Sequence, residues 1–297
     1  MFAVPIWAHT YMTNVSIEGE KLEEGKCIVP PWSNENFPEK DVTSKNMLCR
    51  SESPQLNGGT FCDVNAGSKF VMHFHESGPT DRAISDSHKG PCLAYMAKAE
   101  SNGDGNVWFK IYEDGYDASS DTWCVDTLIK NDGALEVTIP ADISPGKYLL
   151  RGEIIALHEA DRVYGEDKDA GAEFFPSCAM INVVGTGTAN PGQYAIPGIY
   201  DKNDPGIFFN LWDGDTNYII PGPAIYTPGT APAGSVNTTK VGTGPVVSSP
   251  VVAPSLPVNS NSGGKSKACL SKRHKKCSSS SSSRKKKRSR SKKHQRT

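Results

Sequence analysis

Short apolar or alternating runs, separated by turn-forming residues, recur along residues 9–221. The runs are rich in Val, Ile, Tyr and Phe, and Gly, Pro, Asn and Asp stand between them. This spacing is typical of antiparallel sheets. Since no segment shows sustained helical periodicity, we expect an all-β antiparallel sandwich with long loops. The expected strands cover residues 69–75, 91–98, 107–113, 134–140, 147–158 and 178–185.

The segments between these runs differ in character. Residues 99–123 and 159–172 are polar and rich in Gly and Asp, which predicts surface loops. The sequence SPGKY, residues 144–148, contains a Pro-Gly pair. It predicts a hairpin-like connection between the run at 134–140 and a long, buried strand.

Beyond residue 223 the composition changes twice. Residues 224–262 are mostly Pro, Gly, Ser, Thr and Val with almost no charge, which predicts an extended, O-glycosylated linker. Residues 263–297 hold 15 of the 32 Lys and Arg residues and no Asp or Glu, which predicts a disordered tail. Residues 1–262 keep 17 Lys and Arg against 33 Asp and Glu, a net charge of −16. An acidic body therefore carries a strongly basic tail.

Two partners suit a basic tail. The run SSSSSSRKKKRSRS resembles an Arg/Ser segment and favours nucleic acid. Retention on an anionic cell-wall polysaccharide fits better with a secreted body, so we expect that partner and no nucleic acid. CLSKRHKKC, residues 269–277, leaves a small disulfide loop or a metal site open.

The cysteines indicate an oxidising compartment. Six of the eight lie in the body and none is in a CxxC pair, which predicts disulfides of a secreted protein. Asn14 and Asn237 begin N-glycosylation sequons. No run is long enough for a membrane helix.

The first eight residues, MFAVPIWA, are apolar and end in a small residue. Signal peptides end in this way but are usually about 15–30 residues long and begin with positive charge. We interpret residues 1–8 as the remnant of a secretory signal peptide from a gene model truncated upstream; the alternative is that no signal exists. The mature body is then expected to span residues 9–223.

Several motifs share one resemblance. Six segments carry it: SHKGPCLAYMAKA (87–99), GKYLLRGEIIALHEA (146–160), GAEFFPSCAMINVVGTG (171–187), IPGIYDKNDPGIFFNLW (196–212), DVTSKNMLC (41–49) and VNAGSKFVMHFH (64–75). In order and spacing they resemble the fungal lytic polysaccharide monooxygenases of auxiliary-activity family nine. That family consists of copper enzymes that cut cellulose and related glucans, and the resemblance covers residues 9–223.

The resemblance implies a copper site called a histidine brace. The mature N-terminal histidine supplies its α-amine and a ring nitrogen, and the histidine of SHKGP supplies a third nitrogen; His9 and His88 match them. The amine becomes available only if cleavage follows Ala8. Amine and imidazole nitrogens suit Cu(II) in a tetragonal arrangement with open positions.

The resemblance also implies three residues around the metal, two of which depart from the family pattern. His158 matches the family's hydrogen-bonding histidine, whereas Glu173 stands where glutamine is usual and Phe175 where an axial tyrosine is usual. Phenylalanine occupies the axial position without ligating. An ionised glutamate accepts hydrogen bonds but cannot donate them as an amide does. We therefore expect altered activity, with its loss as the alternative.

The family's common disulfide matches Cys49 and Cys178. Position in the chain suggests Cys27 with Cys62 and Cys92 with Cys124. Family members bind sugar rings with aromatic residues on a flat face, and Tyr218 matches one such position. Trp212 and Trp32 are further candidates.

His73 and His75 form an H-x-H on a strand, which places both rings on one face and could bind zinc. With no third ligand evident, we interpret them as structural.

The expected protein is a secreted, monomeric copper-dependent monooxygenase on an immunoglobulin-like sandwich. It would cleave β-1,4-glucan, by default cellulose, with an external electron donor and O2 or H2O2. Oxidation at C1 or C4 is left open. The alternative is a non-catalytic copper-binding or cell-wall-associated relative of the same fold.

Overall fold

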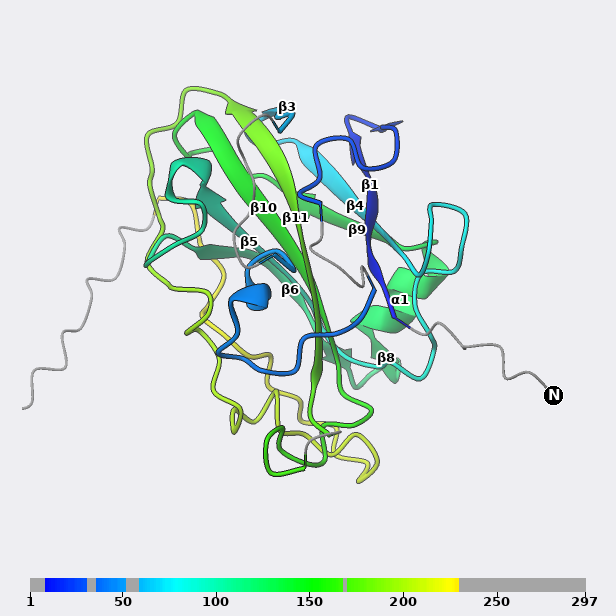
Figure 1. The fold of residues 1–297 in the computed structure, drawn as a ribbon. Coiled ribbons are helices and arrows are strands. Elements are labelled where there is room, and N and C mark those ends of the chain that lie inside the picture. Colours follow the sequence, from blue (N-terminus) through cyan, green and yellow to red (C-terminus); the bar gives the residue numbers. More distant parts are fainter. Residues whose placement is uncertain (1–8, 31–35, 52–58, 168–169, 230–297) are drawn as a thin grey trace, which may run out of the picture. The chain divides into compact units, whose positions relative to one another are not determined.

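Two β-sheets form the body of the protein (Figure 1). The computed structural model describes residues 9–30, 36–51, 59–167 and 170–229. The four-stranded sheet has the order β2 (Glu20–Lys21), β1 (Tyr11–Ile17), β4 (Lys69–His75) and β9 (Ala134–Thr138). The five-stranded sheet has the order β3 (Cys62–Asn65), β11 (Glu173–Val184), β10 (Gly146–Ala156), β5 (Cys92–Lys98) and β6 (Phe109–Asp114). The segments that connect these strands along the chain contain further short elements. They are the two-stranded sheet of β7 (Tyr116–Asp117) and β8 (Thr122–Trp123), the helix α1 (Cys124–Lys130) and the 3₁₀ helices η1 (Lys45–Met47) and η2 (Ala99–Ser101).

The predicted β-sandwich is confirmed, and all six predicted strands are present within a few residues of their expected bounds. One difference is that β11 begins at Glu173, before the predicted strand at 178–185. Another is that β3 pairs with β11 in parallel. The linker beyond residue 229 and the tail at 263–297 lie outside the described residues, and so does Trp32.

The hairpin predicted at 144–148 is wrong. β9 pairs with β4, whereas β10 pairs with β5 and β11, so the connection crosses from one sheet to the other. Ile139 and Ile143 at the start of this crossing are fully buried. Burying these two apolar side chains between the sheets favours the crossing over a solvent-exposed turn.

The helix α1 was not predicted because seven residues are too few to show helical periodicity. Its first turn is stabilised by Asp126, whose carboxylate accepts a hydrogen bond of 2.9 Å from the Trp123 N–H. Polar Asp at this position satisfies a backbone donor that the helix itself leaves unpaired.

The central strands of the five-stranded sheet are buried on both faces. Along β5, Cys92, Ala94 and Met96 pack into the core between the two sheets. The alternating residues Leu93 and Tyr95 pack into a second core on the opposite face. This arrangement explains why β5 reads as a continuous apolar run: each face of a central strand needs an apolar layer.

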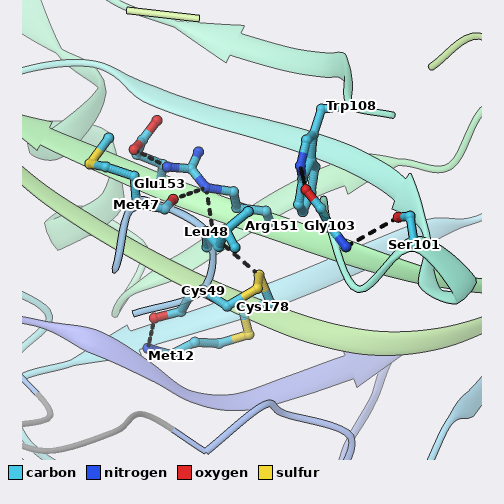
Figure 2. Close-up of a disulfide and its surroundings, with 11 residues drawn as sticks. Met12, Met47, Leu48, Cys49, Ser101, Gly103, Trp108, Arg151, Glu153 and Cys178 are labelled. Carbon is cyan, nitrogen blue, oxygen red and sulfur yellow. Dashed lines mark hydrogen bonds and ion pairs between the residues drawn. A yellow bond between two sulfur atoms is a disulfide. The ribbon is translucent and has the colours of Figure 1, made fainter. Parts of the chain in front are cut away.

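A buried ion pair lies in the second core (Figure 2). The Arg151 guanidinium contacts the Glu153 carboxylate, and both side chains are fully buried in β10. Arg151 Nε also donates to the carbonyl oxygens of Met47 and Leu48, each at 2.9 Å. The Tyr200 hydroxyl donates to Glu153 Oε2 at 2.6 Å. The pair therefore fastens the chain around η1 to the central sheet.

The disulfides follow the expected pairing. Cys49–Cys178, Cys27–Cys62 and Cys92–Cys124 are all bonded, and the first joins segments separated by 129 residues (Figure 2). Cys269 and Cys277 lie outside the described residues.

The sequon at Asn14 lies within β1. The Asn14 side chain is buried there and donates to the Leu22 carbonyl at 3.1 Å, so this sequon is not an accessible glycan acceptor in the folded domain. In the part of the chain that the structure describes, no helix is both long and apolar enough to cross a bilayer.

Replacing Arg151 should destabilise the domain. In Arg151→Met the Glu153 carboxylate stays buried without its cation, which typically costs about 3–5 kcal/mol. Denaturant unfolding of the metal-free protein measures the loss. The control is Lys69→Met, because Lys69 pairs with Glu136 on the surface with 70% and 51% of the side chains exposed; such a pair is worth about 1 kcal/mol or less. Equal stability of the two variants would contradict a structural role for the buried pair.

Candidate metal centre

Three histidines and a glutamate meet at one end of the sandwich. His9 precedes β1, His88 precedes β5 and His158 follows β10. Glu173 is the first residue of β11. Because β10 and β11 pair antiparallel up to Ala156 and Glu173, the chain just past β10 lies beside the start of β11.

The four side chains converge on one carboxylate oxygen. Glu173 Oε2 lies 3.5 Å from His88 Nε2, 3.8 Å from His158 Nε2 and 4.0 Å from His9 Nε2. Ligand atoms of His9, His88 and Glu173 all lie within 4.8 Å of one another. The fold thus places His9 and His88, the two predicted copper ligands, beside Glu173.

The electrostatic setting keeps His88 available as a ligand. Burial above all, together with the neighbouring rings of His158 and His9, lowers its pKa to about 3. Burial likewise lowers the pKa of His9, against the opposing charge of Glu173. Both imidazoles are therefore neutral near pH 7. His88 Nε2 is buried and has no hydrogen-bond partner among the described residues, so its lone pair is free to bind a cation.

Phe175 forms the floor of this cluster. It is fully buried, and its ring centroid lies 5.8 Å from that of His9 and 6.1 Å from that of His88. The Arg50 guanidinium lies 5.7 Å from the centre of the Phe175 ring. This side of the cluster therefore presents an apolar ring without an oxygen atom.

Two cations beside the cluster were not identified from the sequence. Lys40 Nζ lies 3.1 Å from Glu173 Oε1. Arg50 Nη1 donates to the Thr10 carbonyl at 3.4 Å, next to His9, and burial lowers the pKa of Arg50 to about 10. The position of Arg50 directly after the matched Cys49 was an available signal, whereas nothing in the sequence around Lys40 indicates its role.

The loop that carries His88 is fixed to β10 by its backbone. Leu157 N–H donates to the Lys89 carbonyl at 2.8 Å, and Ile155 N–H donates to the Pro91 carbonyl at 3.1 Å. Gly90 lies between these bonds, and a Cβ there would come within 1.8 Å of the Ile155 carbonyl oxygen. The glycine of SHKGP is therefore required for the close approach that places His88.

The predicted aromatic residues lie in different settings. Trp212 is 68% exposed, and its Nε1–H donates to the His158 carbonyl at 3.3 Å. Tyr218 is partly buried: its ring packs against Trp123 and Phe209, and its hydroxyl donates to the Gly206 carbonyl at 2.7 Å. Phe37, which was not predicted, is 53% exposed and lies 5.3 Å from the His9 ring.

His73 and His75 do not form a second centre in the described part of the chain, where the clustered metal-binding groups are His9, His88 and Glu173. His73 Nε2 is 2.8 Å from Ser16 Oγ, and His75 Nδ1 is 2.8 Å from Thr13 Oγ1. These contacts with β1 agree with the structural interpretation of the H-x-H.

The donor set fits copper. Two neutral imidazoles, one with an orphaned buried nitrogen, and a nearby carboxylate oxygen are nitrogen and oxygen ligands of the kind that Cu(II) prefers. The His158 ring lies beside that of His88, and Trp212, which follows β11 in the chain, donates to the His158 carbonyl.

Comparisons with known proteins agree on one family. Residues 9–218 match the model of Auxiliary Activity family 9 (formerly GH61). An AA9 family lytic polysaccharide monooxygenase A from Aspergillus tamarii is 40% identical over 221 residues, covering 73% of this chain and 56% of its own length. The chain spans about half the length of this and other Aspergillus relatives that it matches.

Solved structures show the same relationship. CvAA9A is 36% identical with a TM-score of 0.69, covering 73% of this chain and 98% of its own. A cellulose-active polysaccharide monooxygenase from M. thermophila is 26% identical with a TM-score of 0.57, covering 73% of this chain and 99% of its own.

Gly90→Ala should displace His88. The added Cβ meets backbone rather than a flexible side chain, so the loop must move away from β10. Loss of support for a ligand typically lowers metal affinity by about 10–100-fold. Calorimetric titration of Cu(II) checks the affinity, with Gly78→Ala as the control because a Cβ at Gly78 meets nothing within 4 Å. Unchanged affinity in Gly90→Ala would show that this approach does not position His88.

Proposed function

The chain belongs to Auxiliary Activity family 9, and on this basis we propose that it is a secreted copper-dependent monooxygenase that oxidatively cleaves β-1,4-glucan chains, with cellulose as its substrate. Copper is the cofactor of the family. The convergence of His9, His88 and His158 around one buried oxygen is the observation that carries the proposal.

His9 and His88 would hold the copper. His9 contributes a ring nitrogen and, once the peptide bond between Ala8 and His9 is cleaved, its α-amine. His88 contributes the unpartnered Nε2. The chemistry that copper supplies when bound is one-electron cycling between Cu(II) and Cu(I), which activates O2 or H2O2 to remove a hydrogen from a glucose carbon beside the glycosidic bond. An external donor provides the electrons.

The surrounding residues orient the reactants and limit water. His158 lies with its ring centroid 4.1 Å from that of His88, within reach of an oxygen co-substrate to which its ring N–H can donate. Phe175 covers the buried side and provides no oxygen atom. Glu173 adds a carboxylate where an amide is usual, which changes the hydrogen bonds available to the co-substrate.

The substrate would lie across the exposed rings beside the metal. Both Trp212 and Phe37 are exposed; Trp212 donates to the His158 carbonyl, and the Phe37 ring lies beside that of His9. An exposed ring provides a rigid apolar platform for a sugar. Tyr218 would contact the sugar only with the part of its ring that Trp123 and Phe209 do not cover.

The basic tail would retain the secreted protein on an anionic cell-wall polysaccharide. Its 15 Lys and Arg residues without an acidic residue provide a sequence-independent attraction to such polymers. The tail acts separately from the copper centre in this proposal.

The alternative function is copper binding without catalysis. Glu173 and Phe175 both depart from the family pattern at the metal, which favours a copper-binding relative without catalysis. Such a protein would bind copper through His9 and His88 and release no oxidised product.

Oxidised oligosaccharides should form when the mature protein, beginning at His9 and loaded with copper, is incubated with amorphous cellulose and a reductant. Mass spectrometry detects them and separates C1- from C4-oxidised products. His88→Ala should abolish product because it removes a metal ligand. Copper binding with no oxidised product across a range of pH would support the non-catalytic alternative.

Trp212→Ala should weaken binding to cellulose by about 2- to 10-fold, since a stacked ring contributes about 0.5–1.5 kcal/mol. Copper affinity should stay unchanged. Pull-down on cellulose measures the binding, and the exposed Tyr194 offers the matched variant Tyr194→Ala. Equal loss in both variants would argue against a specific platform at Trp212.

A further inference from the structure

The two oxygens of Glu173 have different partners. Oε1 is paired with Lys40 Nζ at 3.1 Å. Oε2 faces the Nε2 atoms of His88, His158 and His9 at 3.5, 3.8 and 4.0 Å. The side chain is only 7% exposed, and Oε2 is buried without a hydrogen-bond partner among the residues that the structure describes.

An oxygen in this position is costly unless something binds it. Leaving a buried carboxylate oxygen without a donor loses its hydration with no compensation. The nitrogen–oxygen separations exceed the roughly 2.7–3.2 Å of a hydrogen bond. Two ligand atoms that each lie about 2 Å from the same ion are about 3–4 Å from each other. The observed nitrogen–oxygen separations agree with this spacing.

We propose that Glu173 is itself a ligand of the metal in this chain, joining His9 and His88, and that Lys40 positions it. This inference rests on the copper site of the proposed function. A carboxylate oxygen then takes the part of the oxygen that Phe175 cannot provide, from a different position on the same strand β11.

Lys40 is held where it can do this. Glu39 and Phe174 exchange backbone hydrogen bonds of 2.8 and 2.9 Å, so the segment before Lys40 is joined to β11 next to Glu173. The Lys40 ammonium binds Oε1 and leaves Oε2 directed at the histidines. A charge-assisted bond of this kind fixes the orientation of the carboxylate. Lys40 is thus a positioning residue that acts through Glu173.

The first test is Glu173→Gln, which keeps the shape of the side chain and removes its charge. In the mature protein beginning at His9, Cu(II) affinity should fall by at least about tenfold, as it does when ligand geometry is disturbed. The Cu(II) paramagnetic resonance spectrum should change, and the reduction potential should rise because an anionic ligand favours Cu(II) over Cu(I). Glu136→Gln is the matched control, since Glu136 pairs with Lys69 on the surface.

The second test is Lys40→Met, with Lys40→Arg as the conservative variant. Lys40→Met should alter the Cu(II) spectrum in the same direction as Glu173→Gln. Lys40→Arg, which keeps the positive charge, should show the spectrum of the unsubstituted protein. A merely structural lysine would alter the thermal stability of the copper-free protein without altering the spectrum. Lys69→Met controls for the loss of a lysine from an ion pair.

The outcomes separate this inference from the proposed function. If the unsubstituted protein does not bind Cu(II), the copper site itself is wrong. If it binds Cu(II) and Glu173→Gln, folded to the same thermal stability, keeps both affinity and spectrum, the copper site stands and the ligand role of Glu173 is overturned. A raised potential with an unchanged spectrum also overturns it, because a carboxylate outside the coordination sphere would act by charge alone.

Discussion

The buried ion pair of Arg151 and Glu153 is the interaction on which the geometry of the metal end depends. It binds the carbonyls of Met47 and Leu48 to β10, directly before Cys49, and the Cys49–Cys178 disulfide joins the same segment to β11. The residue after Cys49 is Arg50, which contacts the carbonyl beside His9 and the ring of Phe175. One polar contact in an apolar core is thereby connected, through a few residues, to the first predicted copper ligand. The buried charge of Arg151 is balanced by the Glu153 carboxylate and by the two carbonyls that accept from its Nε.

Much of the fold could be predicted from hydrophobic pattern alone. The strands at 69–75 and 91–98 were found within a residue because alternation and continuous burial leave clear signals in the sequence. The connection after β9 was not, since a Pro-Gly turn has the same local chemistry whether the chain returns in the same sheet or crosses to another. Pairing is decided by which sheet the flanking strands join, and that depends on residues far along the chain. The helix α1 was missed because its stability comes from a capping carboxylate and packing rather than from its length.

The candidate site divides in a similar way. His9, His88, His158 and Glu173 could be identified from motifs, and they lie together. Their convergence was implied by resemblance and not by spacing, since four separate segments supply them. Lys40 and Phe37 were not identified because no local pattern marks a lysine or a phenylalanine that reaches a distant strand. Their roles exist only in the tertiary structure.

The supply of the proposed metal donors from three distant segments has a consequence for folding. β1, β5 and β11 must all be in place before the donors approach one another, because His9 and His88 lie just before β1 and β5 and Glu173 is the first residue of β11. A cation therefore has no assembled site in a partly folded chain and cannot nucleate the sandwich. It stabilises only the completed domain, by an amount set by its free concentration relative to its dissociation constant. Occupancy of this site would accordingly report that the whole domain has folded.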